Sequence, residues 1–173
     1  TERARRVGAL VCACVATRDR QDVNPMSDTH ERYMRLALEE AAKAKADGNG
    51  AYGAVVVRDG QVIATGRNEA TTTSDPTAHA ETIAVRNAGI ALGTLDLSGC
   101  TLYATFQPCP MCCGSILVSG ISTVVIGAVP DDPAQTRWPT YSVDRLVEWL
   151  GYQDRITIIT GVLADECRAI LQQ

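Results

Sequence analysis

The sequence predicts an α/β protein in which a mixed five-stranded sheet lies between helices. Short β-rich apolar runs alternate with segments of helical periodicity, and Asp59-Gly60 joins the first two runs as a tight hairpin. A helical segment separates the last two runs, which permits a right-handed crossover and therefore parallel pairing of those strands. At 173 residues, the chain is long enough for one domain with a substantial core.

The expected elements follow one another from residue 28 to residue 172. Asp28 with Glu31 is a candidate capping pair for the first helix, which ends at Gly48, and Gly89 is the expected stop of the second. A polar loop is expected over 68–77. The expected strands span 54–57, 62–65, 101–106, 123–128 and 156–160, and the later helices span 78–88, 110–119, 143–150 and 164–172.

Two short motifs carry the chemistry of the chain. His79-Ala80-Glu81 reads H-x-E, and Pro108 opens a P-C-x-x-C motif that contains Cys109 and Cys112. One imidazole and two thiolates suit Zn²⁺, and three protein ligands leave the fourth tetrahedral position for water. Glu81 lies two residues from His79, where its carboxylate can take a proton from that water. The sequence therefore predicts one catalytic zinc ion per chain, with both motifs in the first turns of helices.

Two other interpretations of the C-x-x-C motif are a structural zinc knuckle and a redox pair. A structural site needs a fourth protein ligand, and Cys113 is badly placed for it because it directly follows Cys112. A redox pair needs no H-x-E motif upstream. The full pattern favours the catalytic interpretation.

The two motifs, in this order and spacing, resemble those of zinc-dependent base deaminases. The resemblance to the cytidine and deoxycytidylate deaminase superfamily extends from about Tyr33 to Cys167, and is densest over 75–81 and 102–115. These stretches are most similar to the branch of guanine deaminases, fungal-type cytosine deaminases and tRNA adenosine deaminases. The resemblance implies a cytidine-deaminase-like three-layer α/β/α fold and hydrolytic deamination, with Glu81 as the proton carrier.

The resemblance also implies substrate contacts. Asn68 matches in spacing the family asparagine that hydrogen-bonds the base, although a loop asparagine that caps a turn is the simpler interpretation. The backbone N–H groups of Ala80 and Cys109 are expected to face the substrate carbonyl and the oxyanion. Trp138 and Tyr141, with Pro139 between them, form an aromatic lid over the base or pack peripherally.

Gln107 stands where guanine and tRNA adenosine deaminases usually have Glu. An amide cannot ionise, which counts against a guanine mechanism with two carboxylates. The net charge is −4, the sequence pI is about 5.1, and no basic run lies in the domain, so nucleic acid is not the expected partner. The expected substrate is a free nucleobase: cytosine or a cytosine-like aminopyrimidine or triazine first, guanine second, and tRNA adenosine third.

The chain is divided into an N-terminal extension, residues 1–25, and a deaminase domain, residues 26–173. Arg3, Arg5 and Arg6 precede the apolar run 7–16, which mimics a secretory signal. The thiolate ligands favour the alternative of a cytoplasmic enzyme whose natural start is Met26. No apolar run is long enough for a membrane span.

A homodimer is expected, because the family branch usually assembles this way. The helix over 110–119 offers apolar side chains for the interface, at Met111, Ile116, Leu117 and Val118.

Overall fold

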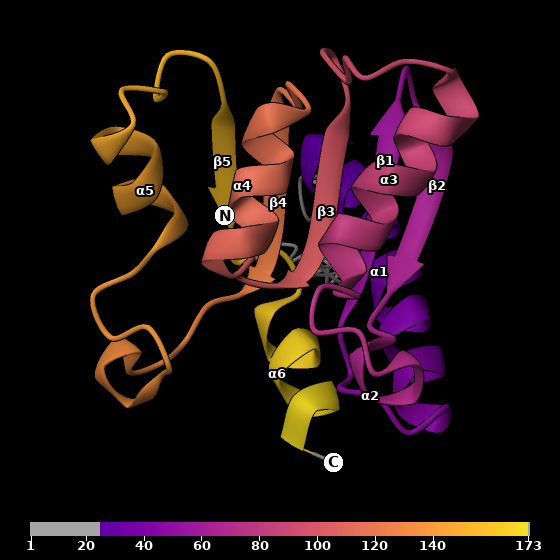
Figure 1. The fold of residues 1–173 in the computed structure, drawn as a ribbon, viewed down its shortest axis with the longest axis vertical. Coiled ribbons are helices and arrows are strands. Elements are labelled where there is room, and N and C mark those ends of the chain that lie inside the picture. The colour runs from indigo at the N-terminus through magenta and orange to yellow at the C-terminus, as the bar shows by residue number, and fades with distance from the viewer. Residues whose placement is uncertain (1–24, 173) are drawn as a thin grey trace, which may run out of the picture.

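The computed structural model describes residues 25–172, which form a sheet covered by helices on both faces (Figure 1). The strands are β1 (Gly53–Arg58), β2 (Gln61–Arg67), β3 (Thr101–Phe106), β4 (Thr123–Ala128) and β5 (Thr157–Thr160). The helices are α1 (Pro25–Ala46), α2 (Ala70–Thr73), α3 (Ala80–Leu92), α4 (Pro110–Val118), α5 (Val143–Trp149) and α6 (Ala164–Gln172), with a 3₁₀ turn, η1 (Pro133–Gln135). The expectations for residues 1–24 lie outside the described residues.

The mixed five-stranded sheet that the sequence predicts is confirmed. Its strand order is β2-β1-β3-β4-β5. β1 pairs antiparallel with β2 and β3, whereas β3, β4 and β5 run parallel. The β1–β2 connection is the expected tight hairpin, because Asp59 and Gly60 have φ angles of 51° and 74°, the left-handed pair that a two-residue turn requires.

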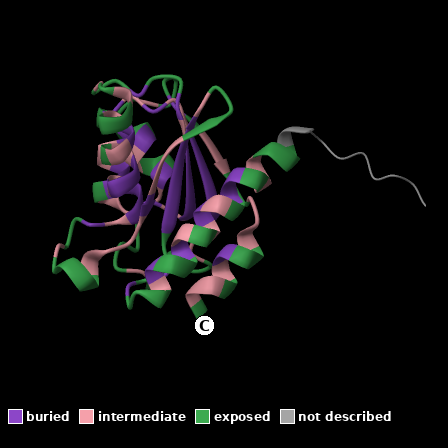
Figure 2. Cartoon of the chain, turned by 90° about the vertical axis from the view of Figure 1, so that its right-hand side faces the viewer, coloured by how far each residue is buried: buried purple, intermediate pink, exposed green. Residues whose placement is uncertain are grey.

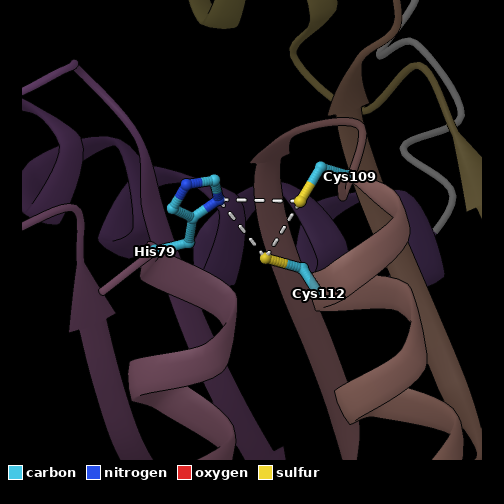
Figure 3. A group of neighbouring side chains, drawn as sticks. All are labelled: His79, Cys109 and Cys112. Atoms are coloured by element: carbon cyan, nitrogen blue, oxygen red, sulfur yellow. Dashed lines mark hydrogen bonds between the residues drawn. The ribbon is translucent and has the colours of Figure 1, made fainter. Parts of the chain in front are cut away.

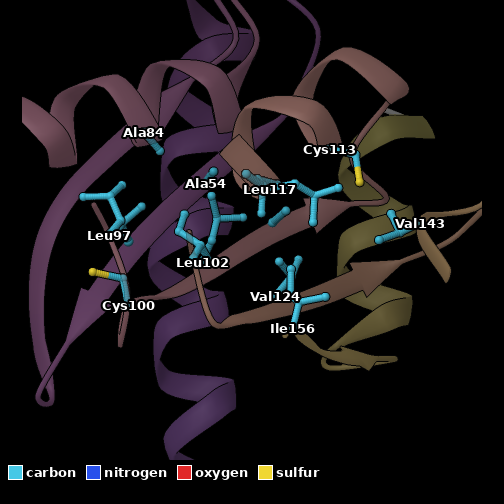
Figure 4. Packing of buried hydrophobic residues seen from close by; sticks show 14 of the residues in the cluster. Ala54, Ala84, Leu97, Cys100, Leu102, Cys113, Leu117, Val124, Val143 and Ile156 are labelled. Atoms are coloured by element: carbon cyan, nitrogen blue, oxygen red, sulfur yellow. The ribbon is translucent and has the colours of Figure 1, made fainter. Parts of the chain in front are cut away.

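Alternate residues of each strand pack into two separate cores, which makes the fold three-layered as expected. Ala54 and Val56 of β1 belong to the core beneath α3, α4 and α5 (Figure 4), and Val55 and Val57 belong to the core beneath α1 and α6. Figure 2 shows the buried sheet between these two helical layers, whose outer faces are exposed.

Three helix boundaries differ from the sequence expectation by two residues or more. α1 begins at Pro25, so Asp28 lies within its first turn and is not the capping residue. Proline suits the start of a helix, since its missing N–H would have no partner there. α3 starts at Ala80 and continues through Gly89 to Leu92, and the glycine that ends it is Gly93, whose φ is 65°.

The expected polar loop over 68–77 contains a short helix, α2. Asn49, which lies outside this segment, stabilises the helix. Its side-chain oxygen accepts hydrogen bonds from the backbone N–H groups of Thr71 and Thr72, both at 3.0 Å. These are donors that the first turn of a helix leaves unpaired. α2 therefore depends on a tertiary contact that local sequence patterns do not reveal.

The apolar surface expected along α4 is only partly present. Ile116 and Leu117 are buried in the core, at 1% and 8% exposure, whereas Val118 is 90% exposed and Met111 is 37% exposed. Ile116 and Leu117 therefore stabilise the fold and cannot form an interface.

Among the helices of residues 25–172, none combines the length and the apolar composition needed to cross a bilayer.

Gly66 in β2 sets how closely α3 approaches the sheet. A Cβ atom at this position would collide with the Ala80 carbonyl oxygen and would lie 2.5 Å from the Ala84 backbone nitrogen. Glycine therefore allows the first turn of α3 to lie directly on the strand. This contact fixes the start of the helix that follows His79.

Candidate active site

The two motifs meet at the N-termini of α3 and α4. His79 is the residue immediately before α3 and Cys109 the residue immediately before α4, and both have extended backbone conformations. The expectation that these two ligands lie in first helical turns is therefore wrong by one residue, whereas Cys112 does lie in the first turn of α4. His79 O and Cys109 O accept the first helical N–H bonds, from Ile83 at 2.9 Å and from Cys113 at 2.8 Å.

Three potential ligand atoms converge between the two helices (Figure 3). His79 Nδ1 lies 3.6 Å from the Sγ atoms of both Cys109 and Cys112, and the two sulfur atoms are also 3.6 Å apart. Within the described part of the chain, no other group of three histidine, cysteine or carboxylate side chains is placed to hold a metal.

This triangle fits a zinc ion. With Zn–S bonds of about 2.3 Å and a Zn–N bond of about 2.0–2.1 Å, tetrahedral angles place the ligand atoms roughly 3.5–3.8 Å apart. The observed separations of 3.6 Å match that spacing. The two sulfur atoms are too far apart for a disulfide, which requires about 2.05 Å. The site therefore offers three ligands and a free coordination position.

The two ligand thiols are within hydrogen-bond contact of each other. The contact with Cys112 lowers the pKa of Cys109 to about 5, and the same contact raises the pKa of Cys112. A divalent cation displaces thiol protons when it binds, because thiolates are the metal-binding form.

Glu81 is the one buried carboxylate among the described residues, with 7% of its surface exposed. Burial raises the pKa of its carboxyl group, and the charge of Cys109 acts in the same direction. A bound dication would act in the opposite direction. A carboxyl group whose pKa is raised by burial can accept and return a proton.

A cavity of about 310 Å³ opens over this cluster. His79, Glu81 and Cys109 line its base, and the other lining residues come from four separate parts of the chain. These are Tyr52, Asn68, Phe106, Gln107, Pro108, Pro130, Thr136, Arg137, Trp138 and Tyr141. The volume lies at the low end of small-molecule pockets, which hold roughly 300–1,000 Å³.

Asn68 has the turn-capping role that was one of its two interpretations from sequence. Its Oδ1 accepts the Ala70 N–H at 2.9 Å, so the side chain caps the turn into α2, and the residue also lines the cavity. This bond shows which atom of the Asn68 side-chain amide is the oxygen and which is the nitrogen. In the described part of the chain, the nitrogen, Nδ2, has no hydrogen-bond acceptor.

Ala80 is buried, and its side chain does not line the cavity. As the first residue of α3, however, it has a backbone N–H without a helical partner.

The segment 129–142 forms one wall of the cavity and contains the predicted aromatic residues. Trp138 and Tyr141 both line the cavity, whereas Pro139 does not. Trp138 is 44% exposed, with the Arg137 guanidinium 5.1 Å from its ring centre. The Tyr141 hydroxyl donates to Pro108 O at 2.7 Å, so this ring is held at the site by a backbone bond.

Sequence reasoning missed Tyr52 and Arg137, which both line the cavity. Phe106 is half-buried and lines the cavity, with its ring 6.1 Å from that of Tyr52 in an edge-on contact. Burial, and then the charge of Glu81, raises the pKa of Tyr52, so its hydroxyl stays protonated at neutral pH. The position of Tyr52 directly before an apolar strand is the only sequence signal that could have indicated it.

The curated relatives of this chain include two kinds of deaminase. A tRNA-specific adenosine deaminase of Bacillus subtilis (strain 168) is 38% identical over 141 residues, which cover 82% of this chain and 85% of the relative. Guanine deaminase of the same organism is 42% identical over 107 residues, which cover 61% of this chain and 69% of the relative. The solved guanine deaminase from Nitrosomonas europaea superposes with a TM-score of 0.73 at 31% identity, over 82% of each chain.

The family model for the cytidine and deoxycytidylate deaminase zinc-binding region matches residues 27–128. The match covers more than half of the chain and includes His79, Glu81, Cys109 and Cys112. The chain therefore belongs to this family of zinc-binding deaminases.

Proposed function

We propose that this protein is a zinc-dependent hydrolytic deaminase of a free nucleobase, with guanine as the preferred substrate. His79, Cys109 and Cys112 hold the zinc ion, and Glu81 carries the protons. The observation that supports this most directly is the buried Glu81 carboxylate beside a three-ligand cluster, at the base of a cavity of about 310 Å³. A cluster of this kind at the end of a small cavity suits attack by water on a bound ring.

The reaction replaces a ring amino group by a carbonyl oxygen. A zinc ion held by His79, Cys109 and Cys112 would lower the pKa of a bound water molecule to about 7. Glu81 takes one proton of the attacking water and delivers it to the ring nitrogen next to the attacked carbon. It then takes the proton of the hydroxyl group now attached to that carbon and transfers it to the amine, so that the C–N bond breaks as the carbonyl forms. One water molecule is consumed and one ammonia is released. The N–H groups of Ala80 and Cys109, which have no partner among residues 25–172, lie at helix N-termini, where partial positive charge stabilises a developing oxyanion.

The cytosine preference expected from the sequence is not supported by these relatives, which are guanine and tRNA adenosine deaminases. Gln107 does not exclude guanine if Glu81 alone carries the protons, since an amide still recognises the base through hydrogen bonds. Asn68 Nδ2 supplies a further donor beside Gln107 in the same cavity. The exposed ring of Trp138 offers a surface for stacking on a planar purine.

A tRNA adenosine is the second candidate substrate, because the relative with that activity matches 82% of this chain. The charges near the cavity favour a free base instead. On segment 129–142, which borders it, Asp131 and Asp132 outnumber Arg137. Phosphate contacts dominate nucleic-acid affinity and require a basic surface.

We also place the enzyme in the cytoplasm. All five described cysteines are free thiols, and zinc–thiolate ligation suits a reducing compartment. Cell fractionation tests this location, and recovery in a secreted fraction would contradict it.

Ammonia release tests the substrate assignment. The zinc-loaded protein is assayed with guanine, cytosine, isocytosine, adenine, cytidine and a tRNA anticodon hairpin. Guanine is expected to react fastest, with little dependence on salt concentration. Efficient deamination of the hairpin with a steep salt dependence, and no ammonia from guanine, would overturn the free-base assignment.

A further inference from the structure

The hydroxyl group of Thr82 lies against one of the three ligand atoms. Thr82 follows Glu81 in the first turn of α3, and its Oγ1 is 3.4 Å from Cys112 Sγ. The contact therefore joins the helix that follows His79 to the helix that contains Cys112. Thr82 is half-buried and Cys112 is fully buried, so solvent competes weakly for this interaction.

The direction of this hydrogen bond follows from the chemistry of the ligand. Either atom could donate if Cys112 kept its proton, but a zinc-ligating cysteine is a thiolate and can only accept. Within the described residues, Thr82 Oγ1 has no second partner. In particular, it makes no bond to the carbonyl of the preceding turn, the acceptor that helical threonines commonly use.

We infer that Thr82 is a positioning residue of the zinc centre, which donates a hydrogen bond from its hydroxyl to the Cys112 thiolate. The bond fixes the direction of the sulfur lone pairs and withdraws electron density from the sulfur atom. Thr82 acts on the metal through Cys112 and touches neither the substrate nor the reacting atoms. The inference rests on the proposed zinc ligation by Cys112 and is independent of which base is the substrate.

Two measurable consequences follow for a chain without this hydroxyl. Loss of a hydrogen-bond partner of a metal ligand typically lowers metal affinity by about 10–100-fold. A thiolate without the bond also gives up its electrons more easily. In the Co²⁺-substituted protein, the sulfur-to-cobalt charge-transfer band should therefore move to lower energy.

Thr82→Val removes the hydroxyl with little change in shape, and Thr82→Ser retains it. Thr157→Val is the matched control, because Thr157 is exposed in β5, on a strand that forms no part of the cavity. Zinc affinity is measured by competition with the chelator 4-(2-pyridylazo)resorcinol, and the Co²⁺ spectrum is recorded for each variant. Thr82→Val should bind zinc about 10–100-fold more weakly and shift the band. Thr82→Ser and Thr157→Val should match the original chain.

A structural role for Thr82 would give a different result. In that case the Tm of the metal-free protein would fall in Thr82→Val, while the band of the folded cobalt form would not move. Thr82→Ala provides the same spectroscopic test if the valine variant does not fold. Unchanged zinc affinity and an unmoved band in either variant would overturn the inference. Failure of the original chain to bind zinc would instead overturn the proposed ligation.

Discussion

The Tyr141 hydroxyl donates a hydrogen bond to the carbonyl oxygen of Pro108, at 2.7 Å. Pro108 directly precedes the ligand Cys109, and Tyr141 ends the part of segment 129–142 that lines the cavity. One bond therefore joins the most exposed wall of the cavity to the base of the site. Trp138, three residues earlier, has no such attachment through its side chain among the described residues and remains 44% exposed.

Replacement of Tyr141 by Phe should weaken substrate binding more than it weakens zinc binding. It removes a hydrogen bond worth about 1 kcal/mol, which corresponds to roughly a five-fold change in an equilibrium constant. KM should rise by about that factor if the wall must be in place for binding. Tyr152→Phe is the control, because Tyr152 is half-buried near β5 and makes no described side-chain hydrogen bond. An unchanged KM in Tyr141→Phe would show that the bond does not organise the cavity.

Replacement of Cys109 by Ala should abolish stoichiometric zinc binding. The substitution removes one of three ligands, and the two that remain cannot complete a stable site. Metal analysis of the purified protein measures the effect. Cys100→Ala is the matched control, because it makes the same change at a core position that is 0% exposed and does not line the cavity. This variant should keep a zinc content near one per chain. Retention of full zinc by Cys109→Ala would rule out this ligand set.

The chemistry of this site could be predicted because its residues occupy two short motifs. His79 and Glu81 are separated by one residue, and Cys109 and Cys112 by two, so local spacing alone indicates a ligand set and a proton carrier. The strands could be predicted equally well, since the alternation of apolar and polar residues and the Asp59-Gly60 turn are local signals in the sequence. Structure was needed to show that the two motifs meet, with ligand atoms 3.6 Å apart.

The walls of the cavity could not be predicted in the same way. Tyr52 and Arg137 are far apart in sequence, and neither belongs to a motif or a periodic pattern. α2 was missed because the partner of its N-terminal N–H groups is Asn49, about twenty residues earlier. α3 was predicted too short because burial of its apolar face outweighs the cost of Gly89 in its last turns, about 1 kcal/mol relative to Ala.

The protein should form a dimer through the groove between α3 and α4. Ile90, Leu95 and Val118 are 73%, 94% and 90% exposed, and all three border this largely apolar groove of about 750 Å³. Contiguous exposed apolar side chains commonly mark an interface. Light scattering should give twice the chain mass at micromolar concentration. Val118→Glu should give the monomer mass, and Trp149→Glu, which alters an exposed residue of α5 outside this groove, should not. A monomeric original chain would contradict the prediction.

Ammonia release from guanine by the Glu81→Ala variant, compared with the original chain at equal zinc content, tests the central claim most directly. Glu148→Ala, at an exposed position of α5, serves as the control. The original chain and the control should release ammonia at the same rate. Glu81→Ala should be slower by about 10²–10⁴-fold, because proton transfer by a positioned side chain contributes that much. A folded, zinc-loaded Glu81→Ala variant with a rate near that of the original chain would contradict the account.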